Sequence, residues 1–507
     1  MGEEFDKLRK ISGTVFDLAS SVSLLEWDQQ TYMPPGGSQG RASQIATLSR
    51  MAHEIFVGDE FGAILEAAEA EVDPDSDEAR VVWRLKRDVE KSRRVPADWV
   101  EEHEHTVRLA FNAWVNARAA SDFNAFRPHL EKVLRLKRAY AEFFAPYEQP
   151  YDPLLDNYEP GITTSSVKEV FDQLRREQVP LVEAITARAD AVDDSFLHQP
   201  FDDQTQWDFG LQVIRDLGYD FERGRQDKAV HPFCTSFNKN DVRITNRING
   251  NFFGPTMFGS MHEAGHAIYD QGIANNLDRI PIMSGSSLTS SHHASLGIHE
   301  SQSRMMENLV GRSRAFWQAY YPRLQQAFSG QLGQVSLDSF YRAINRVRPS
   351  LIRVEADEAT YNLHIMLRFE IELELVQGNL AVADLPEAWN SKIQEFLGLT
   401  PPNDAQGVLQ DIHWADGYIG YFPTYTLGNL IACQLWEQLE QDVPNLSAQI
   451  AAGKFENLVG WLHENIHQQG AKFQPMELLK RVTGQGLTAQ PYLRYLKSKY
   501  GEIYGLN

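Results

Sequence analysis

Residues 257–268 read Met-Phe-Gly-Ser-Met-His-Glu-Ala-Gly-His-Ala-Ile and contain the pattern His262-Glu263-x-x-His266. Residues four apart lie on one face of an α-helix, so both imidazoles can reach one metal ion such as Zn²⁺. Glu263 then lies beside the open coordination position, where it can take a proton from a metal-bound water that attacks a carbonyl. The neighbours of the two histidines are largely apolar or small, which predicts a buried helix.

A third metal ligand has to come from a histidine or carboxylate downstream, and the pair His299-Glu300 supplies both types. The separation of 300 − 266 = 34 residues leaves room for a loop and the start of a returning helix. Glu300 is preferred because sites with three histidines normally use a different spacing, and His299 is the alternative. A structural zinc site in a helical scaffold or binding protein usually has a fourth protein ligand, often cysteine, so that interpretation is disfavoured.

Outward from this segment the chain is predicted to be mainly α-helical, because apolar residues recur near the 3.6-residue period. The helical stretches include 3–25, 78–94, 97–119, 126–144, 165–192, 354–377 and 426–439. A further stretch, 303–329, is expected to be interrupted at Pro322.

Residues 241–248 alternate polar with apolar side chains and lead into Asn249-Gly250, a hairpin-type turn. They predict a small antiparallel sheet beside the metal-binding helix, with a returning strand that begins at Phe252. The 241–248 strand is also expected to be an edge along which a substrate could bind in extended form.

The composition restricts the class of partner. The 507 residues include 48 Lys and Arg against 69 Asp and Glu, a formal charge of −21, which excludes nucleic acid or an anionic membrane surface as the main partner. The uncharged stretch 417–436 contains Pro423 and Asn429 and is predicted to be buried rather than membrane-spanning. The charged amino terminus lacks an apolar signal segment, and two cysteines cannot form a disulfide framework, so a cytoplasmic location is expected.

Several motifs occur in one order along nearly the whole chain, and together they resemble the carboxypeptidase Taq family of zinc metallocarboxypeptidases. Besides the two histidine-containing motifs above, these are Glu26–Pro35, His231-Pro-Phe233, Asp241–Thr245, Ile352–Asp357 and Gly407–Trp414. The resemblance implies an enzyme that hydrolyses the last peptide bond and releases single carboxyl-terminal amino acids with broad specificity. It implies one Zn²⁺ bound by His262, His266 and Glu300, with Glu263 as general base and acid.

The resemblance also implies a mainly α fold with a large helical groove, similar to angiotensin-converting enzyme and neurolysin, with the small antiparallel sheet beside the H-E-x-x-H helix. The whole chain, 1–507, is expected to form a single domain, in which residues 1–150 form a helical subdomain at one wall of the groove. A homodimer is implied as well. Co²⁺ or Mn²⁺ would also suit a site with two histidines and one glutamate.

A carboxypeptidase has to recognise a free α-carboxylate, which requires an arginine or a similar donor. Arg353, at the start of a helical pattern in a family-like motif, is our choice, and Arg243 is the second candidate. The alternative for Arg353 is a structural ion pair with a nearby acid, Glu355, Asp357 or Glu358.

The segment 413–425 resembles the loop rich in histidine and tyrosine that lines the cleft of neurolysin-like peptidases. By that likeness the candidate donors to substrate or oxyanion are His413, Tyr418 and Tyr425, with Tyr421 weaker. Each of them could instead pack a tight turn. Asp411 is expected to orient His413 or a metal-bound histidine.

Two expectations remain open. The loop 280–294 is either a plain connector or a peptide contact through Ser287, Ser290 or His292. The rival activity is that of a zinc oligopeptidase or dipeptidyl carboxypeptidase with the same chemistry.

Overall fold

A computed structural model describes residues 2–284, 287–289 and 293–506 of the chain. The chain forms two compact units, each assembled from separate segments. The first unit contains Met1–Arg93, Asp193–Ile344 and Ile431–Gly486, and the second contains Arg94–Val192, Asn345–Leu430 and Leu487–Asn507. Each unit is discontinuous in sequence, since the chain passes from one to the other five times. The assignment of the whole chain to one domain stays a prediction.

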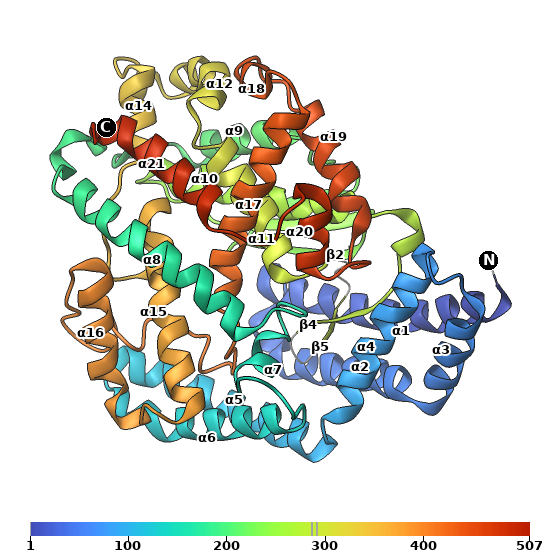
Figure 1. The fold of residues 1–507 in the computed structure, drawn as a ribbon. Helices are drawn as coiled ribbons and strands as arrows, with labels where there is room; N and C mark the ends of the chain where they lie inside the picture. The colour runs from blue at the N-terminus through green and yellow to red at the C-terminus, as the bar shows by residue number, and fades with distance from the viewer. Residues whose placement is uncertain (1, 285–286, 290–292, 507) are drawn as a thin grey trace. The chain divides into compact units, whose positions relative to one another are not determined.

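The first unit is mainly helical (Figure 1). Its helices are α1 (Glu3–Thr31), α2 (Ser38–Val57), α3 (Asp59–Glu71), α4 (Asp77–Arg94), α9 (Asp203–Asp216), α10 (Phe253–Gln271), α11 (Leu296–Arg304), α12 (Arg314–Ala327), α13 (Ser329–Leu332), α14 (Leu337–Ile344), α18 (Leu446–Ala451), α19 (Glu456–Asn465) and α20 (Pro475–Thr483). Helix α10 carries the H-E-x-x-H pattern and is almost wholly buried, as the apolar neighbours of the histidines predict.

A three-stranded sheet packs against α10. It consists of β1 (Gly224–Lys228), β2 (Phe233–Asn238) and β3 (Asp241–Asn246), and β3 lies in the centre, antiparallel to β2 and parallel to β1. The predicted mainly α fold with a small sheet is confirmed, and one of its two strand pairs is antiparallel. The expectation that the 241–248 strand is an edge is wrong, because β3 is paired on both sides and the edges are β1 and β2.

The predicted strand after Asn249-Gly250 does not form. The carbonyl of Gly250 accepts from the backbone N–H of Phe201, and the backbone N–H of Asn249 donates to the Thr256 hydroxyl within α10. These contacts lead the turn directly into α10, while the antiparallel partner of β3 is the preceding strand, β2. A second, two-stranded pair is formed by β4 (Ile282–Ser284) and β5 (Ser287–Thr289).

The predicted interruption at Pro322 is also wrong, because Pro322 lies inside α12. Its ring is exposed, so the backbone carbonyl that it leaves without a partner can face water. The helical stretch is broken earlier, where α11 passes into a π-helical segment, Met305–Val310, before α12 begins at Arg314. Such π-helical turns are frequent at functional sites.

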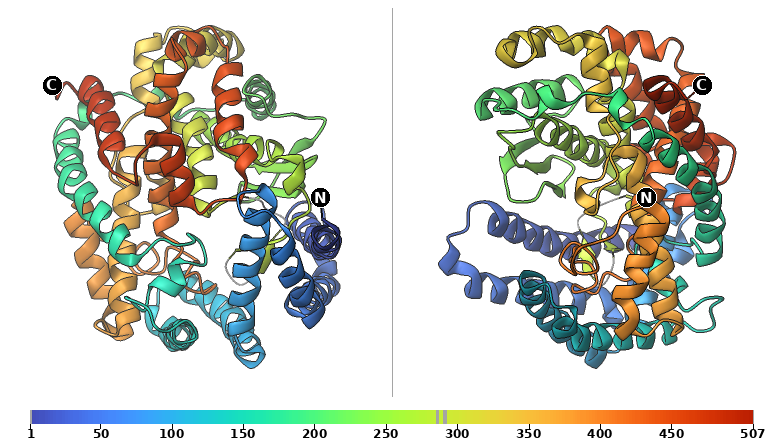
Figure 2. Two further views of the ribbon diagram at one scale, coloured as in Figure 1. Left: turned by 45° about the vertical axis from the view of Figure 1, so that its right-hand side comes forward. Right: turned by 90° about the vertical axis from the view of Figure 1, so that its left-hand side faces the viewer.

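The second unit is also helical, with α5 (Ala97–Ala120), α6 (Phe123–Glu142), α7 (Asp152–Leu155), α8 (Thr164–Thr186), α15 (Glu358–Gln377), α16 (Leu385–Leu397) and α21 (Gln490–Tyr504). Helix α17 (Pro423–Asp442) begins in this unit and continues into the first. Within the second unit, α15 packs against both α8 and α16, and α5 packs against α6 (Figures 1 and 2). No helix in the described ranges combines the length and apolar content needed to cross a membrane.

Candidate active site

Helices α10 and α11 approach each other closely at Gly265, the glycine within the H-E-x-x-H pattern. A Cβ at this position would lie 2.5 Å from the carbonyl oxygen of Gln302 and 2.6 Å from the Cα of Ser303. Real Cβ atoms essentially never come this close to backbone, so any other residue here would push the helices apart. Glycine therefore lets α11 bring Glu300 against the histidines of α10.

The three predicted ligands lie together. One ligand atom from each of His262, His266 and Glu300 lies within 4.8 Å of the others. Glu300 Oε2 is 3.6 Å from His262 Nε2 and 3.4 Å from His266 Nε2. Ligand atoms about 2.1 Å from a tetrahedral centre lie about 3.4 Å from one another, so these separations suit a metal ion between them.

Neighbouring side chains orient two of these ligands. Arg304 Nε donates to Glu300 Oε1 at 2.7 Å, which leaves Oε2 directed at the histidines. His262 Nδ1 is 3.0 Å from Glu307 Oε2, and this contact fixes the imidazole with Nε2 toward Glu300. Glu307 lies in the π-helical segment and is also bonded to Arg304 and Arg312.

His266 is oriented by packing. Its ring stacks on that of His299 with centroids 4.2 Å apart, and its Nδ1 is buried without a hydrogen-bond partner among the described residues. Burial and the neighbouring His299 lower the pKa of His266 to about 3, so its imidazole is neutral, the form that binds a metal. His299 Nε2 is 3.2 Å from Asp270 Oδ1, so the geometry favours Glu300 over His299 as the third ligand.

The acidic groups of the cluster respond to burial in different ways. Burial alone would raise the pKa of Glu300, but Arg304 and His262 outweigh it and hold that pKa well below its usual range. Burial also opposes ionisation of Glu307, yet His262 and Arg304 lower its pKa to about 2. Glu263 is only 6% exposed, and burial raises its pKa to about 7. A divalent cation beside Glu263 would counteract this rise and favour the carboxylate.

The donor set therefore fits a divalent metal ion on three grounds: two imidazole nitrogens and one carboxylate oxygen converge, the imidazole of His266 is neutral, and Glu300 is ionised. The set contains three protein ligands, as in catalytic zinc sites, rather than the four of structural ones. Sequence reasoning missed Glu307, although the spacing 300, 304, 307 is the i, i+4, i+7 pattern of a single helix face.

Replacing Glu307 with glutamine is expected to weaken metal binding by about 10- to 100-fold, because the carboxylate that orients His262 is lost. Competition with a fluorescent chelator measures the change. Glu60→Gln is the matched control, since Glu60 is exposed at the start of α3 and has no ion-pair partner in the described ranges. Equal metal affinity in wild-type protein and Glu307→Gln would contradict the orienting role.

In the second unit, Arg353 belongs to a buried cluster of two arginines and one aspartate. Asp411 accepts from Arg353 Nη2 at 2.8 Å and from Arg368 Nε at 2.8 Å. Arg353 is 6% exposed and Arg368 is fully buried. Burial opposes ionisation of Asp411, but Arg353 and Arg368 outweigh it and lower its pKa far below the usual range. The partner of Arg353 is thus Asp411, which is distant in sequence, and not one of the nearby acids considered from sequence.

This cluster carries one positive charge in excess, from two guanidinium groups and one carboxylate. Asp411 and the Tyr361 hydroxyl engage three of the five N–H groups of Arg353, through Nε, Nη2 and Nη1. The adjacent His413 adds no charge, because burial and Arg353 lower its pKa to about 3. A buried excess charge is unfavourable unless an anion compensates it.

The segment 413–425 places its aromatic side chains beside this cluster. His413 Nε2 is 3.4 Å from the Tyr425 hydroxyl, and the Arg353 guanidinium lies 5.1 Å from the Tyr425 ring centre. Tyr418 is 44% exposed, and its ring centre is 6.4 Å from that of His413. Asp411 Oδ1 is 3.8 Å from His413 Nδ1, beyond hydrogen-bond distance, so Asp411 bonds to the arginines rather than to His413.

Glu372 of α15 anchors this segment, and sequence reasoning did not identify it. Its buried carboxylate accepts from the indole N–H of Trp414, from the backbone N–H of Gly420 and from the Tyr151 hydroxyl. Burial raises its pKa to about 7. One side chain thus holds the segment at two points on either side of Tyr418.

The pH dependence of stability should reveal Glu372. The folded state raises its pKa from about 4.5 to about 7 and so holds a proton that the unfolded chain has released between these values. Its contribution to the free energy of unfolding is therefore full below about pH 4.5 and is lost as the pH rises through 7, a change of about 3 kcal/mol. Glu372→Gln mimics the protonated form and should remove this dependence. Denaturant unfolding of the wild-type protein and Glu372→Gln at pH 5 and pH 8 measures the effect. It is refuted if the two proteins differ in stability by the same amount at both pH values.

The remaining candidates from sequence lie as follows. Arg243 in β3 pairs with Asp241 and lies over the rings of Trp27 and Phe237. The backbone carbonyl of His231 accepts from the Thr245 hydroxyl, while the residue itself is exposed.

In the loop 280–294, residue 287 begins β5, whereas Ser290 and His292 lie outside the described residues.

Comparison with known proteins agrees with this geometry. The sequence model of the carboxypeptidase Taq (M32) metallopeptidases matches residues 7–500. The chain belongs to this family. Among curated relatives, it is 39% identical to carboxypeptidase 1 of Bacillus subtilis over 99% of this chain and 98% of that protein. It is 41% identical to thermostable carboxypeptidase 1 of Thermus thermophilus, over 96% of each protein.

The solved structures agree with this assignment. The M32 carboxypeptidase from Deinococcus radiodurans matches at a TM-score of 0.95 with 42% identity, over 99% of this chain and 100% of that one. The resemblance seen in sequence is thereby confirmed, and the chain is a metallocarboxypeptidase, a peptide hydrolase of the M32 family. Membership also implies a divalent metal ion, which the cluster on α10 and α11 suits.

Proposed function

We propose that this M32 carboxypeptidase uses Zn²⁺ to hydrolyse the last peptide bond of peptides, and that it releases single amino acids with broad side-chain tolerance. The observation that carries the proposal is the convergence of His262, His266 and Glu300, with Glu263 on the same helix. These three residues would hold the ion. When bound, Zn²⁺ polarises the carbonyl and makes water more acidic. Co²⁺ or Mn²⁺ would be accepted by the same ligands.

Glu263 is the proposed general base and acid. Its carboxylate accepts a proton from the attacking water and then donates that proton to the nitrogen of the departing amino acid. Burial supports this role, because it raises the pKa of Glu263 and so helps the side chain to hold the transferred proton, while a bound cation would favour the carboxylate that accepts it. Glu300 cannot substitute for it, because Arg304 and the histidines hold that side chain ionised.

Arg353 is proposed to bind the α-carboxylate of the substrate. The excess positive charge of its cluster supports this role, since a substrate carboxylate would compensate it. Arg368 shares the Asp411 carboxylate, so Arg353 is not fully neutralised by its partner.

The side chains proposed to donate to substrate or oxyanion are His413, Tyr418 and Tyr425. His413 is neutral and therefore retains one N–H to donate without adding charge.

A product assay tests the proposed activity. An amino-blocked tripeptide with a free carboxyl terminus is incubated with the zinc-loaded protein, beside the same peptide as its carboxyl amide. The expected result is release of the last amino acid from the free acid only. Release of dipeptides alone, or equal cleavage of the amide, would instead identify a dipeptidyl carboxypeptidase or an oligopeptidase. Metal analysis of the purified protein identifies the ion.

The proposed assembly is a homodimer in the cytoplasm, and the family resemblance supports both parts. Light scattering on the purified protein gives its mass in solution against the 57.6 kDa of one chain. Cell fractionation tests the location.

A further inference from the structure

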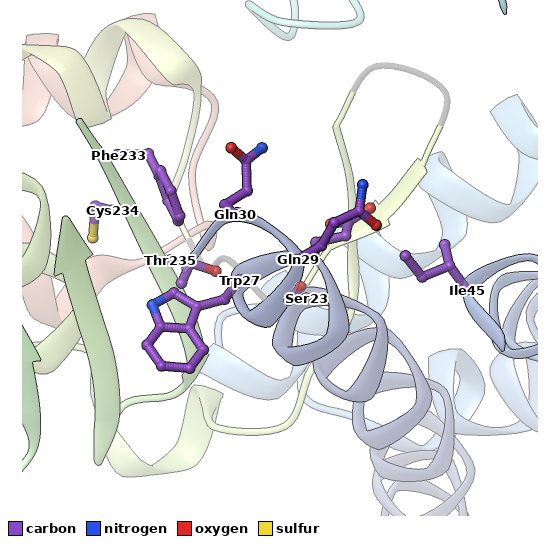
Figure 3. A pocket seen from close by; sticks show the side chains of 9 residues that line it. Ser23, Trp27, Gln29, Gln30, Ile45, Phe233, Cys234 and Thr235 are labelled. Carbon is purple, nitrogen blue, oxygen red and sulfur yellow. The ribbon is translucent and has the colours of Figure 1, made fainter. Parts of the chain in front are cut away.

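A pocket of about 360 Å³ in the first unit is lined by two of the motifs that the catalytic residues do not use. Helix α1 contributes five of the nine lining residues, four of them from the family-like segment that begins at Glu26, and the edge strand β2 contributes Phe233, Cys234 and Thr235. Figure 3 shows Gln29 and Gln30 projecting from α1, with Phe233 on one side and Ile45 of α2 on the other. A pocket of this size accommodates one or two side chains of a ligand.

Three polar side chains of this pocket, Glu26, Gln29 and Gln30, are available to a ligand. Glu26 has neither an ion pair nor a hydrogen bond to any described residue, and the amides of Gln29 and Gln30 also lack protein partners in the described ranges. Glu26 is an exposed residue, and desolvation by the surrounding protein raises the pKa of its carboxyl group. A cation that entered the pocket would compensate this carboxylate.

The pocket adjoins the catalytic helix. Strand β2 packs against α10, and Cys234 lies close enough to Asp270 and Glu263 for their carboxylates to add to the effect of burial in raising the pKa of its thiol. A peptide bound for hydrolysis at Glu263 can therefore extend into the pocket along the edge of β2 that pairs with no described strand.

The charge of the pocket decides which part of the peptide it receives. Among the described residues that line it, Glu26 is the only charged one, so the pocket favours a cation over a carboxyl terminus. In a carboxypeptidase only the last residue, with its carboxylate, lies beyond the scissile bond. The pocket therefore receives the part of the substrate that precedes that bond.

We propose that this pocket binds a positively charged group on the amino-terminal side of the scissile bond, with Glu26 as the specificity-determining residue. The group is an ammonium or guanidinium, supplied either by the α-amino group of a short peptide or by a lysine or arginine side chain. This inference rests on the proposed hydrolysis at the carboxyl terminus and adds a preference for cationic substrates.

The test compares kcat/KM for matched pairs of tetrapeptides at low ionic strength. One arm compares a free amino terminus with its acetylated form, and the other compares lysine with norleucine at the first or second position of acetylated peptides. The wild-type protein is expected to prefer the cationic member of at least one pair by about fivefold, the size expected for one partly exposed charge pair. Glu26→Gln should abolish this preference, and Glu26→Lys should reverse it.

The arm that responds identifies the source of the cation, and 1 M salt should suppress the preference. Glu60→Gln, the same change at an exposed position outside the pocket, should leave the preference intact. The inference is overturned if wild-type protein shows no preference in either arm, or if Glu26→Gln retains it.

A binding measurement separates this inference from the proposed catalysis. In the Glu263→Gln background, calorimetry should show the same preference for the cationic peptide, and the added Glu26→Gln change should remove it. If Glu26→Gln loses the preference for cationic peptides but still hydrolyses neutral peptides, the pocket assignment is supported. Hydrolysis that persists in Glu263→Gln would overturn the proposed mechanism and not the pocket.

Discussion

Glu263→Gln should lower kcat by about a thousandfold while leaving the fold and the metal in place, because the amide can neither accept nor donate the transferred proton. Glu263 is not among the converging ligand atoms, and its side chain has no ion-pair partner in the described part of the chain, so its replacement disturbs neither α10 nor its contact with α11. Turnover of a blocked free-acid peptide measures kcat, metal analysis measures the bound ion, and circular dichroism reports the fold. KM should change little, since the proton moves after the peptide has bound.

Two further variants sharpen that measurement. Glu263→Asp keeps the carboxylate but withdraws it by one methylene, and it should retain more activity than the glutamine variant. Glu300→Gln should instead release the metal, because it removes the charge of a predicted ligand held by Arg304. If Glu263→Gln turns over substrate at the wild-type rate with metal bound, another group carries the proton, and the assignment of Glu263 is wrong.

The convergence of the three candidate metal ligands was predictable because the spacing of the two histidines determines most of it. The i, i+4 separation of His262 and His266 requires only that α10 be helical, and Glu300 lies in the middle of α11. Glu307 lies three residues after Arg304 and seven after Glu300, which is the spacing of one helix face, so it was predictable in principle. Gly265 explains how Glu300 reaches the two histidines, since the missing side chain at this position allows α11 to approach α10.

The cluster around Arg353 was only partly predictable, since its partners are brought together by tertiary packing. Asp411 lies 58 residues from Arg353 and 43 from Arg368, and no helical period connects such positions. Glu372 likewise meets Tyr151 across 221 residues. The central position of β3 has the same origin, because alternation of side chains predicts a strand but not which neighbours it pairs with.

The break between α11 and α12 was misplaced for a different reason. Pro322 is the strongest local signal in that stretch, yet the helix accommodates it on its exposed side. The actual change, to π-helical turns at Met305–Val310, accompanies the contacts of Glu307 with His262 and two arginines. Local propensity therefore failed at the segment that supports the candidate metal site.

Arg353→Ala should lower kcat/KM for free-acid peptides by about 10²- to 10³-fold, since the proposed contact is a buried charge-assisted pair with the substrate carboxylate. Cleavage of the corresponding amides is already slow and should not fall further. The ratio of kcat/KM for the free acid to that for the amide should therefore approach one. The fold should survive, because Asp411 keeps Arg368 as its partner. Both substrates are assayed with each variant, and thermal unfolding reports stability.

Two arginine variants distinguish recognition from a purely structural ion pair. Arg353→Lys retains the charge but not the planar fork, so it should recover only part of the free-acid preference. Arg243→Ala is the matched control, since Arg243 was the other candidate from sequence and is paired with Asp241 outside the Asp411 cluster. If Arg353→Ala unfolds at a lower temperature but keeps the full preference, Arg353 only stabilises the fold. If Arg243→Ala loses the preference instead, the carboxylate is bound by Arg243 at β3.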